Sequence, residues 1–162
     1  MTKAATSRQI LTTALVAGLV AGALDITAAI ATSALRGTAP MRLLQSVASG
    51  LLGNESFSGG AGTAALGLAL HFLIMLGFAG VFVLIFSRSA ALQAHALWSG
   101  IVYGVAVYAF MNVVVLPLSA FPIKLRYGAA LLSIGIATHI VCVGVPMALV
   151  ARARLGAGRE RS

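Results

Sequence analysis

Long apolar stretches alternate with short polar segments along this chain. Four of them cover residues 10–35, 63–86, 97–118 and 127–150. Each is long enough to cross the hydrocarbon core of a bilayer as a helix, which takes about 20 apolar residues. The runs are rich in Leu, Ala and Gly and lack the apolar–polar alternation of a transmembrane barrel. The pattern predicts an all-α fold, a four-helix transmembrane bundle.

A single membrane domain, residues 10–150, accounts for most of the chain. Residues 1–9 form a short N-terminal tail, and residues 151–162 form a basic C-terminal tail. The first apolar run continues to Leu35, beyond the hydrophobic region of a secretory signal. We therefore interpret it as a span that the protein retains.

The first connection, residues 36–62, is too long for a simple turn. Thr38 followed by Pro40 is typical of a helix start. The helix that follows is amphipathic, and one face is predicted to carry Met41, Leu44, Val47, Ala48 and Leu51. Such a helix suits the membrane interface. Glycines between residues 50 and 62 leave a re-entrant segment as the alternative, although Arg42 disfavours entry into hydrocarbon.

Composition supports a membrane protein and excludes other classes. Of the 162 residues, 60% are hydrophobic and 9% are charged, and the mean hydropathy is +1.03. A soluble domain of this size cannot bury so much apolar surface. The net charge of +8 does not indicate nucleic-acid binding, because the basic residues stand at the ends of apolar runs without interleaved aromatic residues. Cys142 is the only cysteine, which excludes a disulfide framework within one chain.

An even number of spans places both termini on the same side of the membrane. Seven basic residues then share that side, and four lie on the other. The larger set is Lys3, Arg8, Arg88, Arg152, Arg154, Arg159 and Arg161, and the smaller set is Arg36, Arg42, Lys124 and Arg126. The positive-inside rule therefore predicts that the N and C termini are cytoplasmic.

Small residues predict where the spans meet. Gly18 and Gly22 form a GxxxG pair in the first span, and Gly100 and Gly104 form another in the third. Such pairs let two helix backbones approach closely. We expect these glycines to pack helices within the lipid bilayer, and we expect a homodimer or a larger membrane complex.

Asp25 is an acid within an otherwise apolar run. An ionised carboxylate near mid-bilayer costs about 2.5–3.5 kcal/mol, so this group should be neutral or hold a partner. Counting 1.5 Å per residue along spans of alternating direction brings one polar residue of each other span to a similar depth. We predict an intramembrane polar layer formed by Asp25, His71, Asn112 and His139. Its side chains serve either as interhelical hydrogen bonds or as a functional site.

Several functions are compatible with this layer. We favour a non-enzymatic transport-related protein or accessory subunit without a cofactor, with Asp25 and His71 as a possible proton or solute path. The alternative is an electron-transfer subunit with haem b or a metal between His71 and His139. Catalysis has little support, because Ser119 and Ser133 have no base near them in sequence and the chain contains neither HExxH nor a P-loop.

Five blocks of the sequence carry a resemblance to known proteins. They are GxxAGxxD at 18–25, RLLQSVASGLLG at 42–53, TAALGLALHF at 63–72, YGVAVYAFMNVVVLPLSA at 103–120 and HIVCVGVP at 139–146. Together they resemble a family of small four-span bacterial inner-membrane proteins of unassigned function, similar in layout to YagU-like proteins. The resemblance implies a bacterial inner-membrane location and supplies no activity or site residue.

Overall fold

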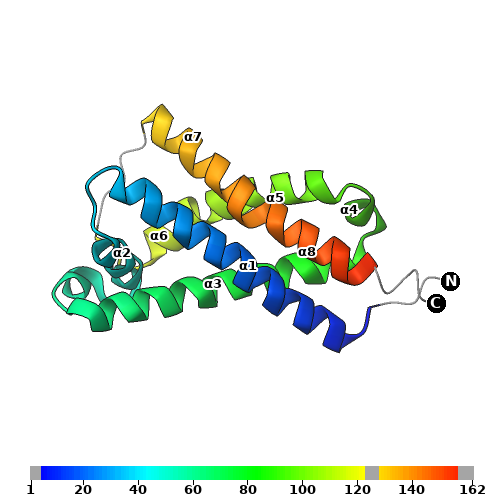
Figure 1. Cartoon of the computed structure of the whole chain (residues 1–162), viewed down its shortest axis with the longest axis horizontal. Helices are drawn as coiled ribbons and strands as arrows, with labels where there is room; N and C mark the ends of the chain where they lie inside the picture. The colour runs from blue at the N-terminus through cyan, green and yellow to red at the C-terminus, as the bar shows by residue number, and fades with distance from the viewer. Residues whose placement is uncertain (1–4, 123–127, 157–162) are drawn as a thin grey trace.

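The computed structural model describes residues 5–122 and 128–156, and all regular structure in this part of the chain is helical. Four helical spans run lengthwise through the molecule (Figure 1). They are α1 (Ser7–Ala34), α3 (Gly60–Arg88), a third span (Ala96–Leu118) and a fourth span (Ala129–Gly156). All four are apolar and long enough to cross a membrane, which confirms the predicted all-α four-helix bundle.

The third and fourth spans each contain a π-helical segment. The third consists of α5 (Ala96–Phe110), the π-helical segment Met111–Val115 and α6 (Leu116–Leu118). The fourth consists of α7 (Ala129–Thr138), the π-helical segment His139–Gly144 and α8 (Val145–Gly156). A π-helical turn widens the helix and bends it locally, and the apolar sequence pattern does not predict it.

The fourth span is longer than its apolar run. Its helix continues beyond residue 150 to Gly156 and includes the exposed side chains of Arg152 and Arg154. Arginine favours helical structure, so the helix does not have to end where the hydrophobic residues end. The basic residues Lys3, Lys124, Arg126, Arg159 and Arg161 lie outside the described residues.

Local sequence sets both ends of α1. Thr6 Oγ1 accepts a hydrogen bond from the Gln9 amide, and Gln9 Oε1 accepts one from the Thr6 amide at 2.9 Å. This reciprocal capping box satisfies two amides that the first helical turn leaves without partners. The chain leaves α1 through Gly37, whose φ of +79° is accessible to glycine without strain.

The first span packs against α3 through its glycine pair. A Cβ on Gly18 would lie 2.8 Å from Leu76 Cδ2, and a Cβ on Gly22 would lie 2.8 Å from Phe72 Cε1. These separations are shorter than carbon atoms tolerate, so a larger residue at either position would force the Leu76 or Phe72 side chain to shift. On its other side α1 crosses the fourth span (Figure 1).

The third and fourth spans meet through a second set of glycines. A Cβ on Gly104 would lie 2.6 Å from the carbonyl oxygen of His139, and a Cβ on Gly100 would lie 2.7 Å from that of Gly144. Backbone packs directly on backbone here, as small-residue motifs allow in membranes. The four glycines that the sequence singles out therefore lie at two separate helix contacts.

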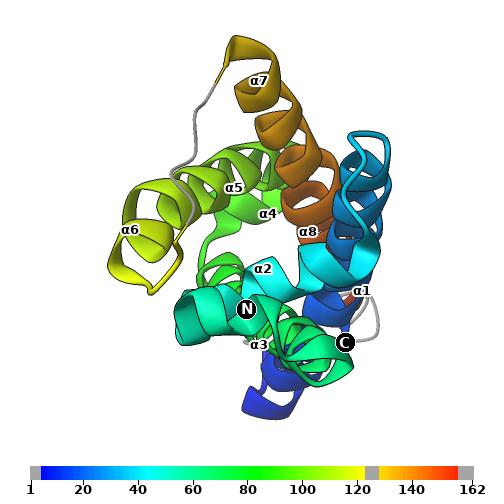
Figure 2. The same cartoon turned by 90° about the vertical axis from the view of Figure 1, so that its left-hand side faces the viewer.

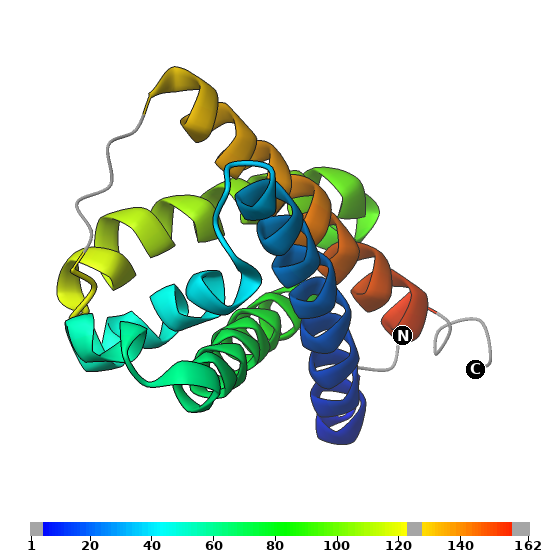
Figure 3. The ribbon, with the colours of Figure 1, turned by 60° about the vertical axis from the view of Figure 1, so that its left-hand side comes forward.

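The helix α2 (Pro40–Leu52) crosses one end of the bundle instead of following its long axis (Figure 2). It lies between α3 and the end of the third span (Figure 3). Gly67 of α3 allows this contact, because a Cβ there would overlap the carbonyl group of Leu44. At its C-terminal end the Gly50 carbonyl oxygen accepts a hydrogen bond from the Ala120 amide at 2.9 Å. The crosswise arrangement is the one expected of an interfacial helix.

The structure shows which side of α2 packs on the bundle, a choice that the amphipathic pattern leaves open. Its buried residues are Gln45, Ala48 and Ser49, whereas Met41 and Leu51 are exposed. The Gln45 side-chain amide donates to the carbonyl oxygen of Gly60 at 3.0 Å. In a membrane, polar side chains find their partners inside the protein and apolar ones can face lipid. The buried side of α2 therefore combines the polar Gln45 and Ser49 with the small Ala48.

The two ends of the molecule are distinct. The start of α1 and the end of α8 lie at the same end, together with the short helix α4 (Ala90–Ala94) (Figure 1). The helix α2 and the start of α7 lie at the opposite end (Figure 1). This arrangement follows from an even number of spans and defines a terminal end and an α2 end, the names used below.

Candidate functional site

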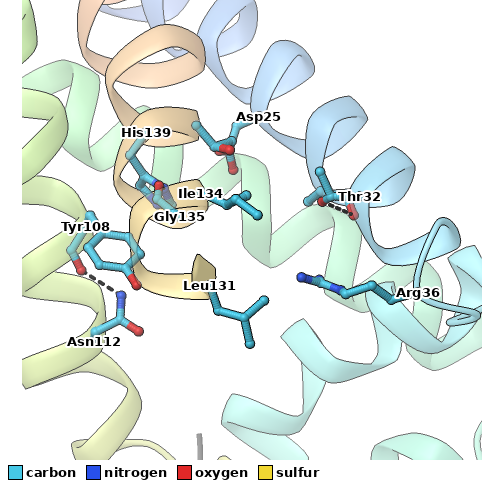
Figure 4. Close-up of a pocket in the computed structure, with 11 residues that line it drawn as sticks. Asp25, Thr32, Arg36, Tyr108, Asn112, Leu131, Ile134, Gly135 and His139 are labelled. Atoms are coloured by element: carbon cyan, nitrogen blue, oxygen red, sulfur yellow. Dashed lines mark hydrogen bonds between the residues drawn. The ribbon is translucent and has the colours of Figure 1, made fainter. Parts of the chain in front are cut away.

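A cavity of about 340 Å³ opens between α1, the third span and the fourth span (Figure 4). Asp25, Ala29, Thr32 and Arg36 form its α1 side. Asp25, Ala29 and Thr32 are spaced by three or four residues and therefore lie on one face of α1, and Arg36 follows in the turn after the helix. An acid and a guanidinium group therefore line the same cavity from one wall.

The facing walls carry hydrogen-bonding groups. The third span contributes Tyr108 and Asn112, and the fourth contributes Thr138 and His139 together with the backbone at Gly135. A carboxylate, a guanidinium, a phenol, an amide and an imidazole thus gather around one volume between apolar helices (Figure 4). Such a collection suits a ligand that carries both charge and hydrogen-bonding groups.

The π-helical segments position two of these groups. Asn112 and His139 lie at or next to the first residue of their π-helical segments. Asn112 Nδ2 donates to the carbonyl oxygen of Tyr108 at 2.8 Å, and His139 Nδ1 lies 3.0 Å from the carbonyl oxygen of Gly135. Each side chain thus satisfies a carbonyl four residues earlier, where the hydrogen-bonding pattern changes. π-Helical turns occur frequently at functional sites.

Tyr108 packs closely between the third and fourth spans. Its ring meets the His139 ring edge to face, with 5.2 Å between the centroids. A Cβ on Gly135 would lie 2.5 Å from Tyr108 Cε2, so glycine is required for the ring to lie there. The phenol ring is therefore held at the cavity wall by the fourth span.

Three residues of the predicted layer, Asp25, Asn112 and His139, line this cavity. The fourth, His71, does not belong to its lining: its Nε2 lies 3.0 Å from the carbonyl oxygen of Gly22. His71 therefore lies at about the same height along the bundle as Asp25. It contacts the backbone of α1 on the side that faces α3, away from the polar cavity. The structure brings three of the four predicted residues together and places His71 at a helix contact.

Hydrogen-bond partners indicate which imidazole nitrogens carry hydrogen. A carbonyl oxygen only accepts, so Nε2 of His71 and Nδ1 of His139 are the donors. In a neutral His139 the Nε2 atom therefore keeps its lone pair. In His71 the Nε2 atom instead donates to the Gly22 carbonyl oxygen. Among the described residues, no three His, Cys, Asp or Glu side chains gather as metal ligands.

A second cavity, of about 590 Å³, adjoins the first. The two share the lining residues Ala29, Thr32, Arg36, Tyr108, Asn112 and His139. The remaining lining comes from α2, α3, the end of the third span and Ser33 of α1, and it is mostly apolar with three serines, Ser33, Ser46 and Ser119. We call the first volume the polar cavity and the second the apolar cavity.

Sequence reasoning missed four polar contributors to the polar cavity, namely Thr32, Arg36, Tyr108 and Thr138. The signal for Thr32 is its spacing from Asp25, because a position seven residues later lies on the same helical face. Arg36 lies in the turn after α1, where helical spacing no longer applies. Tyr108 stands one turn before Asn112 and shares its face because of the same helical spacing.

No protein-family model, curated protein or solved structure matches this chain.

Proposed function

We propose that this chain is a non-enzymatic, multi-pass protein of the bacterial inner membrane, with cytoplasmic termini, that acts in transport as a carrier or accessory subunit. The polar cavity is the observation that carries the proposal. Ionisable side chains within spans are functional-site candidates by default, because placing them there is costly. Here Asp25 shares a cavity with polar groups of two other spans.

The depth of Asp25 supports a transport role. This residue follows the first residue of α1 by 18 positions, or roughly 27 Å of helix at 1.5 Å per residue. Arg36 marks the α2 end of the same cavity wall. The polar groups therefore lead from the α2 end into the part of the bundle that hydrocarbon would surround, which gives a solute or a proton a route partway across.

Charge distribution supports the proposed orientation. Among the described residues, Arg8, Arg88, Arg152 and Arg154 lie toward the terminal end, and Arg36 and Arg42 lie toward the α2 end. The positive-inside rule favours a cytoplasmic terminal end. In this orientation the polar cavity lies toward the outer face of the inner membrane.

Reconstitution into liposomes tests the proposal. An imposed potential should drive proton entry above the protein-free level, and Asp25→Asn should return it to that level because the amide cannot exchange a proton. Glu55→Gln is the matched control, since it removes an exposed carboxylate outside the spans and should leave the flux unchanged. The accessory role predicts instead that a transport complex copurifies from native membranes and loses activity with Asp25→Asn. The proposal would be refuted if the parent protein conducts no protons and no transport complex copurifies with it.

A further inference from the structure

The apolar cavity has the character of a chain-binding chamber. It is bounded by Leu43, Val47 and Leu51 of α2 and by Leu70 and Ile74 of α3. Its volume of about 590 Å³ falls within the range of roughly 300–1,000 Å³ that small-molecule sites occupy. Its lining comes largely from α2, α3 and the third span, and α2 lies between the other two (Figure 3).

The two cavities meet at polar side chains. Thr32, Arg36, Tyr108, Asn112 and His139 line both of them. A ligand that fills both volumes would therefore pass from an aliphatic chamber, across hydrogen-bonding groups, to a region lined by Asp25. This order of surroundings corresponds to an amphiphile with an acyl chain, a polar centre and a cationic end.

We propose that the two cavities bind one aminophospholipid, with an acyl chain in the apolar cavity, the phosphate near Arg36 and the amine near Asp25. This inference rests on the proposed transport function and names the class of solute that the polar cavity takes.

Arg36 supplies the phosphate-binding chemistry. Its planar guanidinium group is cationic and offers several donors that match phosphate oxygens. Figure 4 shows the side chain extending from the end of α1 toward Leu131 across the cavity. Thr32 and Tyr108 carry hydroxyl groups at the same junction and can donate to further phosphate oxygens.

Asp25 explains why the head group should also carry an amine. Nine residues of helix, or roughly 14 Å, separate Asp25 from the end of α1 at Ala34, and Arg36 follows in the next turn. The long Arg36 side chain bridges part of this distance, and Figure 4 shows the two residues at opposite ends of the cavity. A head group with a phosphate and an ammonium group satisfies both, whereas a purely anionic head group leaves the carboxylate without a cation.

Lipid-binding measurements on the full-length protein in mild detergent test the polar part. After delipidation, phosphatidylethanolamine, phosphatidylglycerol and inorganic phosphate are added separately, and binding is followed by native mass spectrometry. Phosphatidylethanolamine should bind most tightly and inorganic phosphate should not compete. Arg36→Gln should weaken both lipids by about tenfold, the effect of one lost charge-assisted hydrogen bond. Asp25→Asn should lower phosphatidylethanolamine binding to the level of phosphatidylglycerol.

Matched variants separate the site from general effects. Arg88→Gln removes an exposed guanidinium at the terminal end and should leave binding unchanged. Leu70→Trp fills the apolar cavity and should reduce the binding of both lipids, whereas Leu73→Trp, on the exposed face of α3, should not. Ile74→Trp provides a second cavity-filling variant if Leu70→Trp fails to fold.

The outcomes distinguish this inference from the proposed function. Equal lipid retention by all variants would identify only bulk lipid around the bundle and would overturn the inference. Competition by inorganic phosphate would indicate a free-phosphate site and would overturn the acyl-chain assignment. Tighter binding of phosphatidylglycerol, unaffected by Asp25→Asn, would overturn the amine assignment. Asp25-dependent proton flux without selective lipid binding would leave the transport function standing and remove the lipid.

Discussion

The Nε2 atom of His71 lies 3.0 Å from the carbonyl oxygen of Gly22, which joins the second span to the first by a side chain-to-backbone hydrogen bond. This contact lies beside Phe72, whose ring approaches α1 closely because Gly22 has no side chain. Helix association in membranes depends on packing and on hydrogen bonds such as this one, because lipid is as apolar as the helix surface. His71 therefore has a structural task that does not involve the polar cavity.

Replacing His71 by leucine should destabilise the bundle. The substitution removes the donor to the Gly22 carbonyl, and hydrogen bonds between spans contribute about 0.6–1.7 kcal/mol. We expect the free energy of unfolding to fall by that amount in an SDS titration of the purified protein. His95→Leu is the control, because His95 is exposed in the link between α4 and α5. Equal stability of both variants would contradict the assigned task.

A single methyl group on Gly104 should separate the third and fourth spans. The added Cβ would lie 2.6 Å from the His139 carbonyl oxygen and 2.7 Å from Ile140 Cα, and neither backbone atom can rotate away. Overpacking of this kind costs about 1–3 kcal/mol, so Gly104→Ala should lower the SDS concentration at the unfolding midpoint.

Gly77 offers a matched control for that variant. A Cβ there meets nothing within 4 Å, and the residue is exposed on α3. Gly77→Ala should be neutral or stabilising by about 0.5–1 kcal/mol, because alanine is the better helix former. A parallel loss of stability in both variants would show that the helix contact at Gly104 is not the cause.

The long helices were predictable because the membrane leaves the chain little choice. Backbone amides within hydrocarbon require partners inside the same segment, so the length of an apolar run decides where a helix lies. Glycine pairs were equally informative, since a Cβ at Gly104 would meet the backbone of the fourth span and one at Gly22 would displace the Phe72 ring. The sequence did not predict which side of α2 packs on the bundle, because amphipathicity identifies two faces without indicating which one contacts protein.

The sequence predicted the height of each site residue along the bundle but not the direction in which its side chain points around the helix axis. Counting residues along antiparallel spans gives a height for each side chain. It brought Asp25, Asn112 and His139 to one cavity, but it assigned His71 to the same layer although that side chain is directed to the α1 backbone. Helical phase carries the missing information, and applying it to α1 would have identified Thr32 but not Arg36, which lies in the turn after the helix.

The haem alternative leads to an optical prediction. Axial ligation would require one ring nitrogen of each histidine to face a common iron, yet Nε2 of His71 is engaged by Gly22 and this residue is absent from both cavities that His139 lines. We expect protein purified in mild detergent to show no Soret band. A band that disappears in both His71→Ala and His139→Ala would establish the electron-transfer function instead.

Cysteine labelling tests the orientation of the bundle. The starting protein is Cys142→Ala, a conservative change because a lone cysteine within a span behaves as a small hydrophobic residue. Ser7→Cys, Ala90→Cys and Asn54→Cys then place single thiols at exposed positions, the first two at the terminal end and the third after α2. An impermeant maleimide should label the Asn54 variant in intact spheroplasts and the other two only after the membrane is opened. Labelling of Ser7→Cys with protection of Asn54→Cys would reverse the orientation. Opposite behaviour of Ser7→Cys and Ala90→Cys would contradict the bundle itself, because α1 and α3 would then not form an antiparallel pair across the membrane.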